Sequence, residues 1–153
     1  MKTLTSTLIY LTGAAILLLA AGNGLASEGD LNNMGNGICL DRGTKLMWEI
    51  DKSKRYSDIA AVNAYVSNLK LGGYSDWRLP TTSESIELRG LIAIQGNDDC
   101  NIPRLDSKYW LVDEKKGTVP ARLELECFCR GDFNLIVKDK GYARLVRDSK
   151  PVN

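Results

Sequence analysis

The chain has no histidine among its 153 residues. This absence excludes a histidine general base, and with it the Ser-His and Cys-His nucleophile systems of many hydrolases. A zinc site would need mostly thiolate ligands for the same reason. The sequence assembles no catalytic group, so we expect a protein that is not an enzyme and that uses no metal or cofactor.

The sequence also lacks an excess of charge of either sign. It has 20 lysines and arginines against 19 aspartates and glutamates. Lys2 is the only charged residue in the first 26 positions, so the rest of the chain carries a formal net charge of zero. A neutral chain gives no reason to expect nucleic acid as a partner.

Only the first 26 residues contain a sustained apolar run. Lys2 precedes an apolar stretch over residues 8–21, and small residues at 24–26 complete the pattern of a secretory signal peptide cleaved before Ser27. An uncleaved membrane anchor is the alternative, but the stretch is short for a membrane span. We therefore predict an exported protein, periplasmic or extracellular, with no membrane span after cleavage and about 127 residues for one domain.

Four cysteines lie in the predicted mature chain: Cys39, Cys100, Cys127 and Cys129. In an exported chain, an even number of cysteines predicts two disulfides. Cys127 and Cys129 are two residues apart, and a bond between them would close a very small, strained ring. We expect each of them to pair with Cys39 or Cys100, in an order that the sequence does not fix. A redox or metal site on Cys127 and Cys129 is the alternative.

The first half of the mature chain predicts a lead-in, a hairpin and two helices. Residues 27–36 are polar and glycine-rich, which is typical of a flexible lead-in. Alternating apolar residues over 37–50 predict a hairpin with its turn at 41–44. Apolar residues at helical spacing predict a helix over 57–69, started by Ser57 or Asp58 and closed by Gly72-Gly73, and a second helix over about 82–94.

The second half predicts strands. After a loop over 95–107, short segments rich in β-branched and aromatic residues are separated by glycine-bearing turns, at 109–112, 122–129, 133–137 and 142–146. Helices followed by antiparallel strands predict a compact single α+β domain.

The most specific pattern is Gly72-Gly73-Tyr74-Ser75-Asp76-Trp77-Arg78-Leu79-Pro80-Thr81. Pro80 forces the residue before it into an extended conformation. Thr81 and Glu84 have the spacing of a capping box, which starts a helix. We interpret Arg78, next to Asp76, as a member of a structural ion pair or as a loop clamp, rather than as a ligand contact. The three tryptophans are interpreted as core anchors rather than as sugar platforms.

This pattern belongs to an ordered set of four. The others are Leu46-Met47-Trp48, Tyr109-Trp110 and Tyr142-Ala143-Arg144-Leu145-Val146-Arg147. The set resembles the C-terminal domain family of the Legionella collagen-like adhesin, over Gly37 to Arg147. It departs from the family at Val66 and Leu145, where many members have cysteine. A wider similarity, to the formylglycine-generating and C-type-lectin-like group, implies a lectin-like fold.

The resemblance implies one domain over 37–148, followed by a tail at 149–153. We expect a structural role for the motif residues Trp48, Asp76, Trp77, Arg78, Pro80, Trp110, Arg144 and Arg147. For the adhesin, the family implies binding of sulfated glycosaminoglycans by a trimer. This chain has no collagen-like region, so its oligomeric state is not predicted.

Basic residues crowd the C-terminal end of the chain: Lys138, Lys140, Arg144, Arg147 and Lys150. A solvated face is one interpretation. The other is a docking site for an acidic ligand, such as a sulfated or uronic-acid glycan.

Three more groups of residues suggest other functions. Asp98 and Asp99, with Asn97 and Asn101, could hold calcium through oxygen ligands, although a polar loop beside a bridged cysteine is the simpler interpretation. Glu124 and Glu126 share a strand face, as paired catalytic carboxylates would. A formylglycine-generating activity would require Cys127 and Cys129 as free thiols.

The first hypothesis is therefore a non-catalytic exported bacterial domain that binds a surface or extracellular ligand, with an acidic glycan as the candidate. A structural or protein-interaction module of the cell envelope is the alternative.

Overall fold

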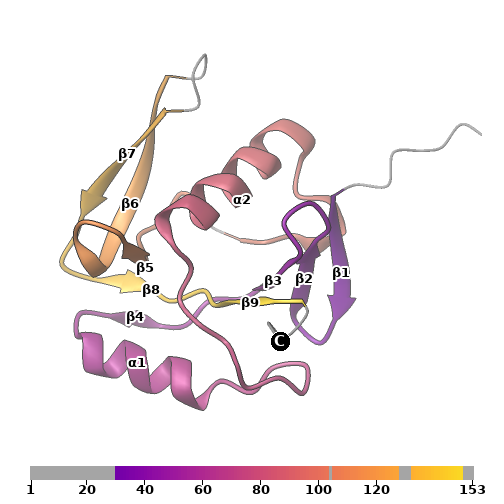
Figure 1. The fold of residues 1–153 in the computed structure, drawn as a ribbon, viewed down its shortest axis with the longest axis horizontal. Coiled ribbons are helices and arrows are strands. Elements are labelled where there is room, and N and C mark those ends of the chain that lie inside the picture. The colour runs from indigo at the N-terminus through magenta and orange to yellow at the C-terminus, as the bar shows by residue number, and fades with distance from the viewer. Residues whose placement is uncertain (1–29, 104, 128–131, 150–153) are drawn as a thin grey trace, which may run out of the picture.

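The computed structural model describes residues 30–103, 105–127 and 132–149. The predicted signal peptide, Cys129, Lys150 and most of the predicted tail lie outside these residues. The described residues form one α+β domain with two mostly antiparallel sheets and two α-helices (Figure 1). The predicted fold class is confirmed.

The first sheet has the strand order β1-β2-β3-β9. Its strands are β1 (Leu31–Gly35), β2 (Ile38–Asp41), β3 (Leu46–Glu49) and β9 (Val146–Asp148). The antiparallel pairing of β2 with β3 confirms the predicted hairpin. The prediction of a flexible lead-in is wrong from residue 31 onward, because Leu31 is buried in the core and β1 pairs with β2.

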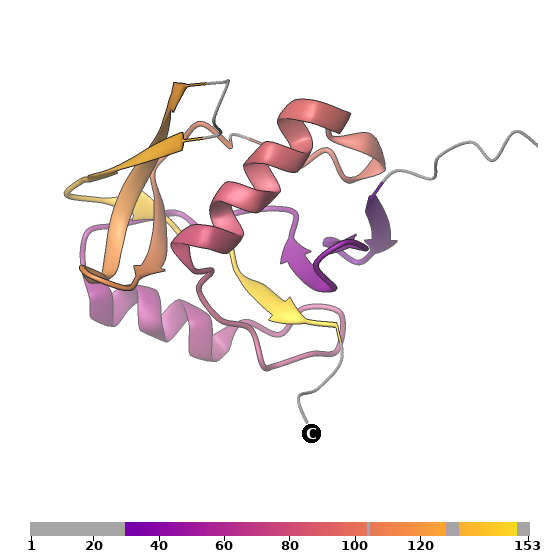
Figure 2. The ribbon, with the colours of Figure 1, turned by 45° about the horizontal axis from the view of Figure 1, so that its top comes forward.

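The second sheet has the order β4-β8-β5-β6-β7. Its strands are β4 (Arg55–Tyr56), β5 (Tyr109–Asp113), β6 (Gly117–Cys127), β7 (Asp132–Val137) and β8 (Gly141–Tyr142). The long β6–β7 hairpin projects from the body of the domain (Figures 1 and 2).

The predicted strand over 142–146 is wrong, because the chain there leaves one sheet and joins the other. Residues 143–145 run between β8 and β9 and are buried. Their backbone is bonded by the end of β3 and by the segment after it: the Leu145 N–H donates to a Glu49 carboxylate oxygen, and the Ala143 N–H donates to Ser53 Oγ. These partners lie 90 residues and more away in sequence, so no local pattern predicts the break.

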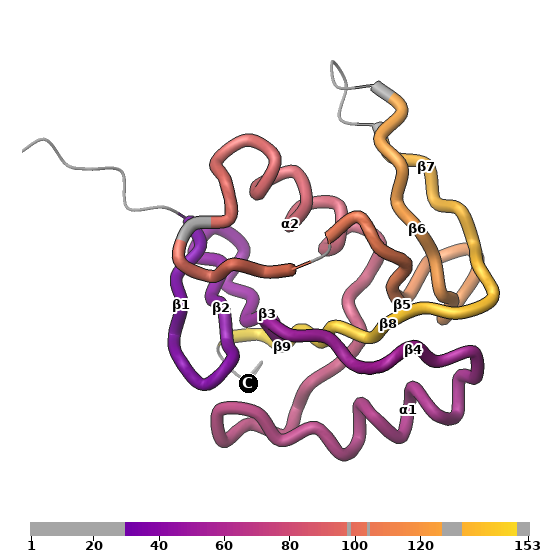
Figure 3. The backbone as a smooth tube through the Cα atoms, turned by 180° about the vertical axis from the view of Figure 1, so that it is seen from behind, coloured from indigo at the N-terminus to yellow at the C-terminus, as the bar shows by residue number. Residues whose placement is uncertain are grey.

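The two helices are α1 (Ile59–Asn68) and α2 (Thr82–Gln95), and a short 3-10 helix, η1, spans Asp98–Cys100. They lie on opposite sides of the central strands β3, β8 and β9 (Figures 1 and 3). Asp58 caps α1 by accepting hydrogen bonds from two backbone N–H groups. The predicted capping box of α2 is confirmed, because Thr81 and Glu84 each bond the other's backbone N–H.

The glycine pair was predicted to end α1, but it does not. The helix ends at Asn68, and its C-cap, Leu69, is extended, with φ −68° and ψ 120°. Gly72 and Gly73 have φ of 61° and 83° and form the turn between Leu71 and Tyr74, whose backbones exchange two hydrogen bonds. A Cβ on Gly72 would lie 2.2 Å from Ile38 Cδ1. Glycine is needed there for its backbone conformation, and a larger residue would also have to displace the end of the Ile38 side chain.

The tryptophans are core residues, as expected: Trp48, Trp77 and Trp110 are at most 4% exposed. Trp48 packs in the cluster that holds the disulfide and α2, whereas Trp77 and Trp110 pack in the cluster that holds α1.

The predicted disulfide partners are wrong. Cys39 of β2 bonds Cys100 of η1, across 61 residues, so neither is available to Cys127 or Cys129. The pairing follows from the position of η1, which packs against the β1–β2 hairpin.

Candidate functional site

The polar residues of the tryptophan motif hold the scaffold together. Arg78 donates two hydrogen bonds to the Glu84 carboxylate, at 2.8 and 2.7 Å, and Glu84 also accepts from the Thr81 N–H at 2.8 Å. Burial opposes ionisation of Glu84, but the bonds from Arg78 and Thr81 outweigh it and lower the pKa of this carboxyl. Arg78 therefore clamps the first turn of α2.

Asp76 pairs with Arg147 and not with its neighbour Arg78, which corrects the predicted ion pair. Arg147 donates two hydrogen bonds to the Asp76 carboxylate, at 2.8 and 3.0 Å, and these bonds lower the pKa of Asp76. The Arg147 guanidinium also lies over the Tyr74 ring, 3.8 Å from its centroid. This contact ties the motif segment to β9.

Arg144 is a second buried clamp. Its guanidinium donates to three backbone carbonyls, those of Asp51 and Ile50 at 3.2 Å each and that of Pro103 at 2.7 Å. Its other face lies 4.9 Å from the centroid of the Tyr109 ring. Arg144 thus joins the segment after β3 to the loop that precedes β5.

These contacts change the predicted acidic-ligand patch. Arg144 and Arg147 are each 4% exposed and are engaged inside the domain. Lys138 is half-buried and Lys140 is exposed, while Lys150 lies outside the described residues. The five residues therefore do not form one exposed basic surface.

Glu49 is a buried carboxylate at the junction of the two sheets. It accepts hydrogen bonds from the Tyr65 hydroxyl and, at 2.9 Å, from the Leu145 N–H. Burial raises the pKa of Glu49, against the lowering effects of Tyr65, Leu145 and Arg144, while Asp51 adds to the rise. Burial and the neighbouring Glu49 also raise the pKa of Tyr65.

This environment predicts a pH-dependent stability. A carboxyl with a raised folded-state pKa costs stability when it is ionised, and the cost disappears as the pH falls toward its ordinary value of 4.5. We expect the wild type to gain unfolding free energy relative to Glu49→Gln when urea unfolding at pH 5 is compared with pH 7. Parallel changes in the two proteins would contradict this expectation.

A basic and aromatic surface cluster lies elsewhere, around Tyr142. The Lys52 ammonium lies 4.0 Å and the Arg55 guanidinium 5.1 Å from the centroid of the Tyr142 ring. The Tyr109 ring packs against the same tyrosine, with centroids 5.8 Å apart. The arrangement follows from the sheet, because Tyr142 pairs with Arg55 on one side and its N–H donates to the Lys108 carbonyl on the other. We call Lys52, Arg55, Tyr109 and Tyr142 the Tyr142 cluster.

Among the residues that the structure describes, the cations of the Tyr142 cluster have no acidic partner. Over residues 30–103, 105–127 and 132–149, neither Lys52 nor Arg55 forms an ion pair with a carboxylate. Lys54 lies nearby, 5.7 Å from the centroid of the Tyr56 ring. This site was not predicted from the sequence, although the basic and aromatic run Lys52-Ser53-Lys54-Arg55-Tyr56 contains two of its four residues.

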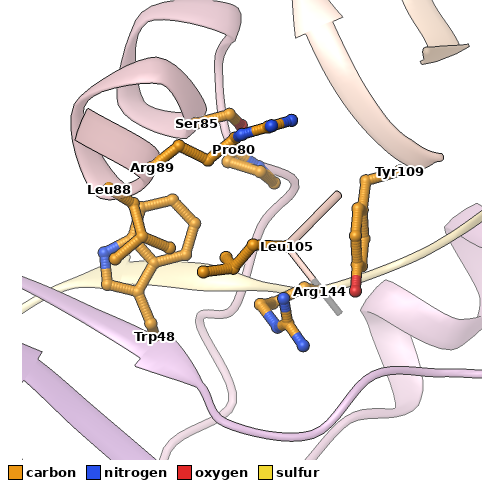
Figure 4. A pocket seen from close by; sticks show the side chains of 8 residues that line it. All are labelled: Trp48, Pro80, Ser85, Leu88, Arg89, Leu105, Tyr109 and Arg144. Atoms are coloured by element: carbon orange, nitrogen blue, oxygen red, sulfur yellow. The ribbon is translucent and has the colours of Figure 1, made fainter. Parts of the chain in front are cut away.

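A small apolar cavity lies next to this cluster. It has a volume of about 40 Å³ and is lined by residues of α2, β3, β5, the segments between them and the segment between β8 and β9: Trp48, Pro80, Ser85, Leu88, Arg89, Leu105, Tyr109 and Arg144. Figure 4 shows Leu105 pointing toward Trp48 and Leu88 from the side opposite α2. Tyr109 belongs both to the cavity and to the Tyr142 cluster.

A wider groove, of about 460 Å³, runs between α1, the motif segment and the start of β6. A second hollow shares Thr81 and Val112 with this groove and continues it to Asp113. One carboxylate in each is already bonded. Glu84 binds Arg78, and Asp113 accepts from the Thr82 hydroxyl at 2.9 Å. These two carboxylates are therefore engaged within the domain rather than directed at a ligand in the groove.

Two of the other polar residues considered in the sequence make ordinary structural contacts. The Asn97 side chain bonds the backbone of Ile102 at both its oxygen and its nitrogen, at 2.9 and 2.8 Å, and so shapes the loop after α2. Glu124 lies 3.5 Å from Arg122. Among the residues that the structure describes, no three side chains of metal-binding type come together.

Comparison with known proteins gives no match: no family model, no curated protein and no solved structure matches the chain. Neither helix in the described part is long and apolar enough to cross a membrane.

Proposed function

We propose that this protein is a non-catalytic, exported binding module whose ligand is acidic and lies on the Tyr142 cluster. One observation carries the proposal. Lys52 and Arg55 are held over one tyrosine ring without a carboxylate partner among the described residues. Cations gathered in this way favour an anionic partner, because its charge compensates theirs on binding.

The sequence patterns support the rest of the proposal. The signal-peptide pattern of residues 1–26 favours export to the periplasm or the extracellular space. The motif set favours a distant relationship to the adhesin C-terminal domain family, for which glycan binding is the implied activity. The acidic ligand we propose is therefore a glycan that carries sulfate or uronic-acid groups.

The proposal predicts salt-sensitive binding that depends on two named cations. We expect the purified exported protein to bind a heparin-type polymer at low salt, and the double variant Lys52→Gln/Arg55→Gln to bind about tenfold more weakly. Raising the salt concentration should reduce the difference, because exposed charges are screened. Affinity measured by calorimetry over a salt titration checks both effects.

A matched control removes two other exposed lysines, Lys70, which follows α1, and Lys115, which lies in the turn after β5, at the end of that strand opposite the residue that pairs with Tyr142. This control should bind nearly as the wild type does. Equal weakening in both double variants would mean that only net charge matters, and the Tyr142 cluster would lose its role. Absence of binding to any acidic glycan at low salt would overturn the function.

A protein-interaction role in the cell envelope is the second candidate. The β6–β7 hairpin favours it, because the hairpin projects from the domain (Figure 2) and keeps Leu125 and Val137 39% and 44% exposed. Apolar side chains on such a projection are typical of a surface that a partner covers.

A further inference from the structure

Strand β7 forms an open edge of the second sheet. It is the last strand in the order β4-β8-β5-β6-β7, so no strand of the described residues pairs with its outer side. Figures 1 and 3 show β7 at the outside of the fold, beyond β6 as seen from α2. Residues 133–137 of this strand include no charged residue and no proline. Natural proteins usually protect an open edge with charges or proline, so an unprotected edge favours pairing with another strand.

The hydrogen bonds of β7 show which of its backbone groups face away from β6. The Lys138 N–H donates to the Pro120 carbonyl at 2.8 Å, so Lys138 faces β6. In an antiparallel pair, residues that bond the neighbouring strand alternate with residues that face away from it. The Lys116 ammonium donates to the Leu135 carbonyl at 3.3 Å, which agrees with a carbonyl that faces away from β6. Three residues of β7 therefore direct their N–H and C=O groups outward: Phe133, Leu135 and Val137.

This edge is complementary to itself. Two antiparallel copies of β7 centred on Leu135 pair Leu135 with Leu135 and Phe133 with Val137, so every outward residue meets another. Each such pair can exchange two backbone hydrogen bonds. A shift of two residues in either direction would place Phe133 or Val137 opposite a residue outside β7.

The same register is complementary in charge. It places Asp132 of one copy opposite Lys138 of the other, once at each end of the paired segment. Opposite charges in facing positions stabilise two paired strands. Asp132 and Lys138 lie six residues apart on one extended strand, roughly 20 Å, so they cannot pair within a single copy.

We infer that β7 is a homodimer interface, at which the β7 strands of two copies pair antiparallel around Leu135. The pairing packs Val137, which is 44% exposed in the single chain, beside Phe133 of the second copy. The Leu135 N–H of the second copy then bonds the carbonyl that Lys116 bonds in the single chain. The inference does not depend on the proposed ligand, because the Tyr142 cluster lies on β4, β8 and β5, and β6 separates these strands from β7.

The first test removes an outward donor. Sedimentation equilibrium of the purified exported protein should show a reversible equilibrium between monomer and dimer. Val137→Pro should weaken the dimer about tenfold, because each copy loses an N–H group that bonds the other copy. The fold should be retained, because this N–H does not bond β6 and an edge strand tolerates proline at such a position. Val137→Thr keeps the N–H and the branched side chain, so it should dimerise as the wild type does.

The second test exchanges the charges and addresses the register. Lys138→Asp places two acidic residues opposite each other at both ends, so it should weaken the dimer about fivefold. The double variant Asp132→Lys/Lys138→Asp restores opposite charges and should recover the affinity of the wild type. Circular dichroism checks that all variants are folded.

Amide hydrogen exchange locates the interface within the strand. As the protein concentration rises, the N–H groups of Leu135 and Val137 should exchange more slowly, whereas that of Ile136, which faces β6, should keep its rate. A protein that stays monomeric up to about 1 mM would overturn the inference. A dimer that Val137→Pro leaves unchanged, or whose affinity the charge exchange does not restore, would overturn it as well. None of these results bears on the acidic-ligand function.

Discussion

Replacing Cys39 and Cys100 by alanine should lower the free energy of unfolding by about 4 kcal/mol. The bond closes a loop across 61 residues, and releasing so long a loop increases the conformational entropy of the unfolded chain. Both cysteines are also buried, so their removal loses packing against Trp48 and Leu88. Urea unfolding monitored by circular dichroism measures the difference.

Two controls make this result specific. The variant Cys127→Ala/Cys129→Ala keeps the Cys39–Cys100 bridge and should retain its contribution to stability. Peptide mapping without reduction should recover Cys39 and Cys100 in one crosslinked species. A Cys39→Ala/Cys100→Ala variant that unfolds at the urea concentration of the wild type would contradict the pairing.

Replacing Trp110 by alanine should cost about 3–5 kcal/mol of unfolding free energy. Trp110 is 4% exposed and packs with Val62 of α1 and Leu145 in the second large core cluster. Its indole N–H donates to the Tyr56 carbonyl at 3.1 Å, so it also joins β5 to β4 across the sheet. Truncation leaves a large cavity and an unpaired carbonyl at once.

Val112, on the same strand, provides a matched control for Trp110→Ala. Val112 lies two positions along the same strand and is 39% exposed, so Val112→Ala should change stability by less than about 1 kcal/mol. Trp110→Phe should fall between the two variants, because it keeps most of the ring and loses the hydrogen bond. A Trp110→Ala variant as stable as Val112→Ala would contradict the anchoring role.

Elements whose signals are local were predicted correctly. The β2–β3 hairpin follows from alternation around one turn, and the start of α2 follows from Thr81 and Glu84, which are three residues apart. The tryptophans were placed in the core because a large apolar ring has one favourable place in a small domain.

Features that depend on distant partners were not predicted. Asp76 stands two residues from Arg78 in sequence, but it binds Arg147, 71 positions away. Charge adjacency in the sequence therefore gave the wrong partner. The buried positions of Arg144 and Arg147 have the same cause, since each is enclosed by segments from elsewhere in the chain, and the basic patch inferred from their spacing does not form.

The Tyr142 cluster could be predicted only in part from the sequence. Its basic run over residues 52–56 is visible in the sequence, whereas Tyr142 joins it only through the pairing of β4 with β8. A search for basic runs alone would have found half of the candidate site. The cavity beside it combines α2, β3 and β5, and no single stretch of sequence contains it.

The position of β9 bears on how the chain acquires its structure. Val146 lies between Trp48 of β3 and the backbone of Arg78, with which it exchanges two hydrogen bonds of 2.9 Å. Synthesis runs from the N-terminus, so β3 and the motif segment lack this neighbour until residues 146–148 have been made. Contacts between such distant segments form slowly. We therefore expect the first sheet to be completed only after residues 146–148 have been made, whereas Cys39 and Cys100 are both present before that point.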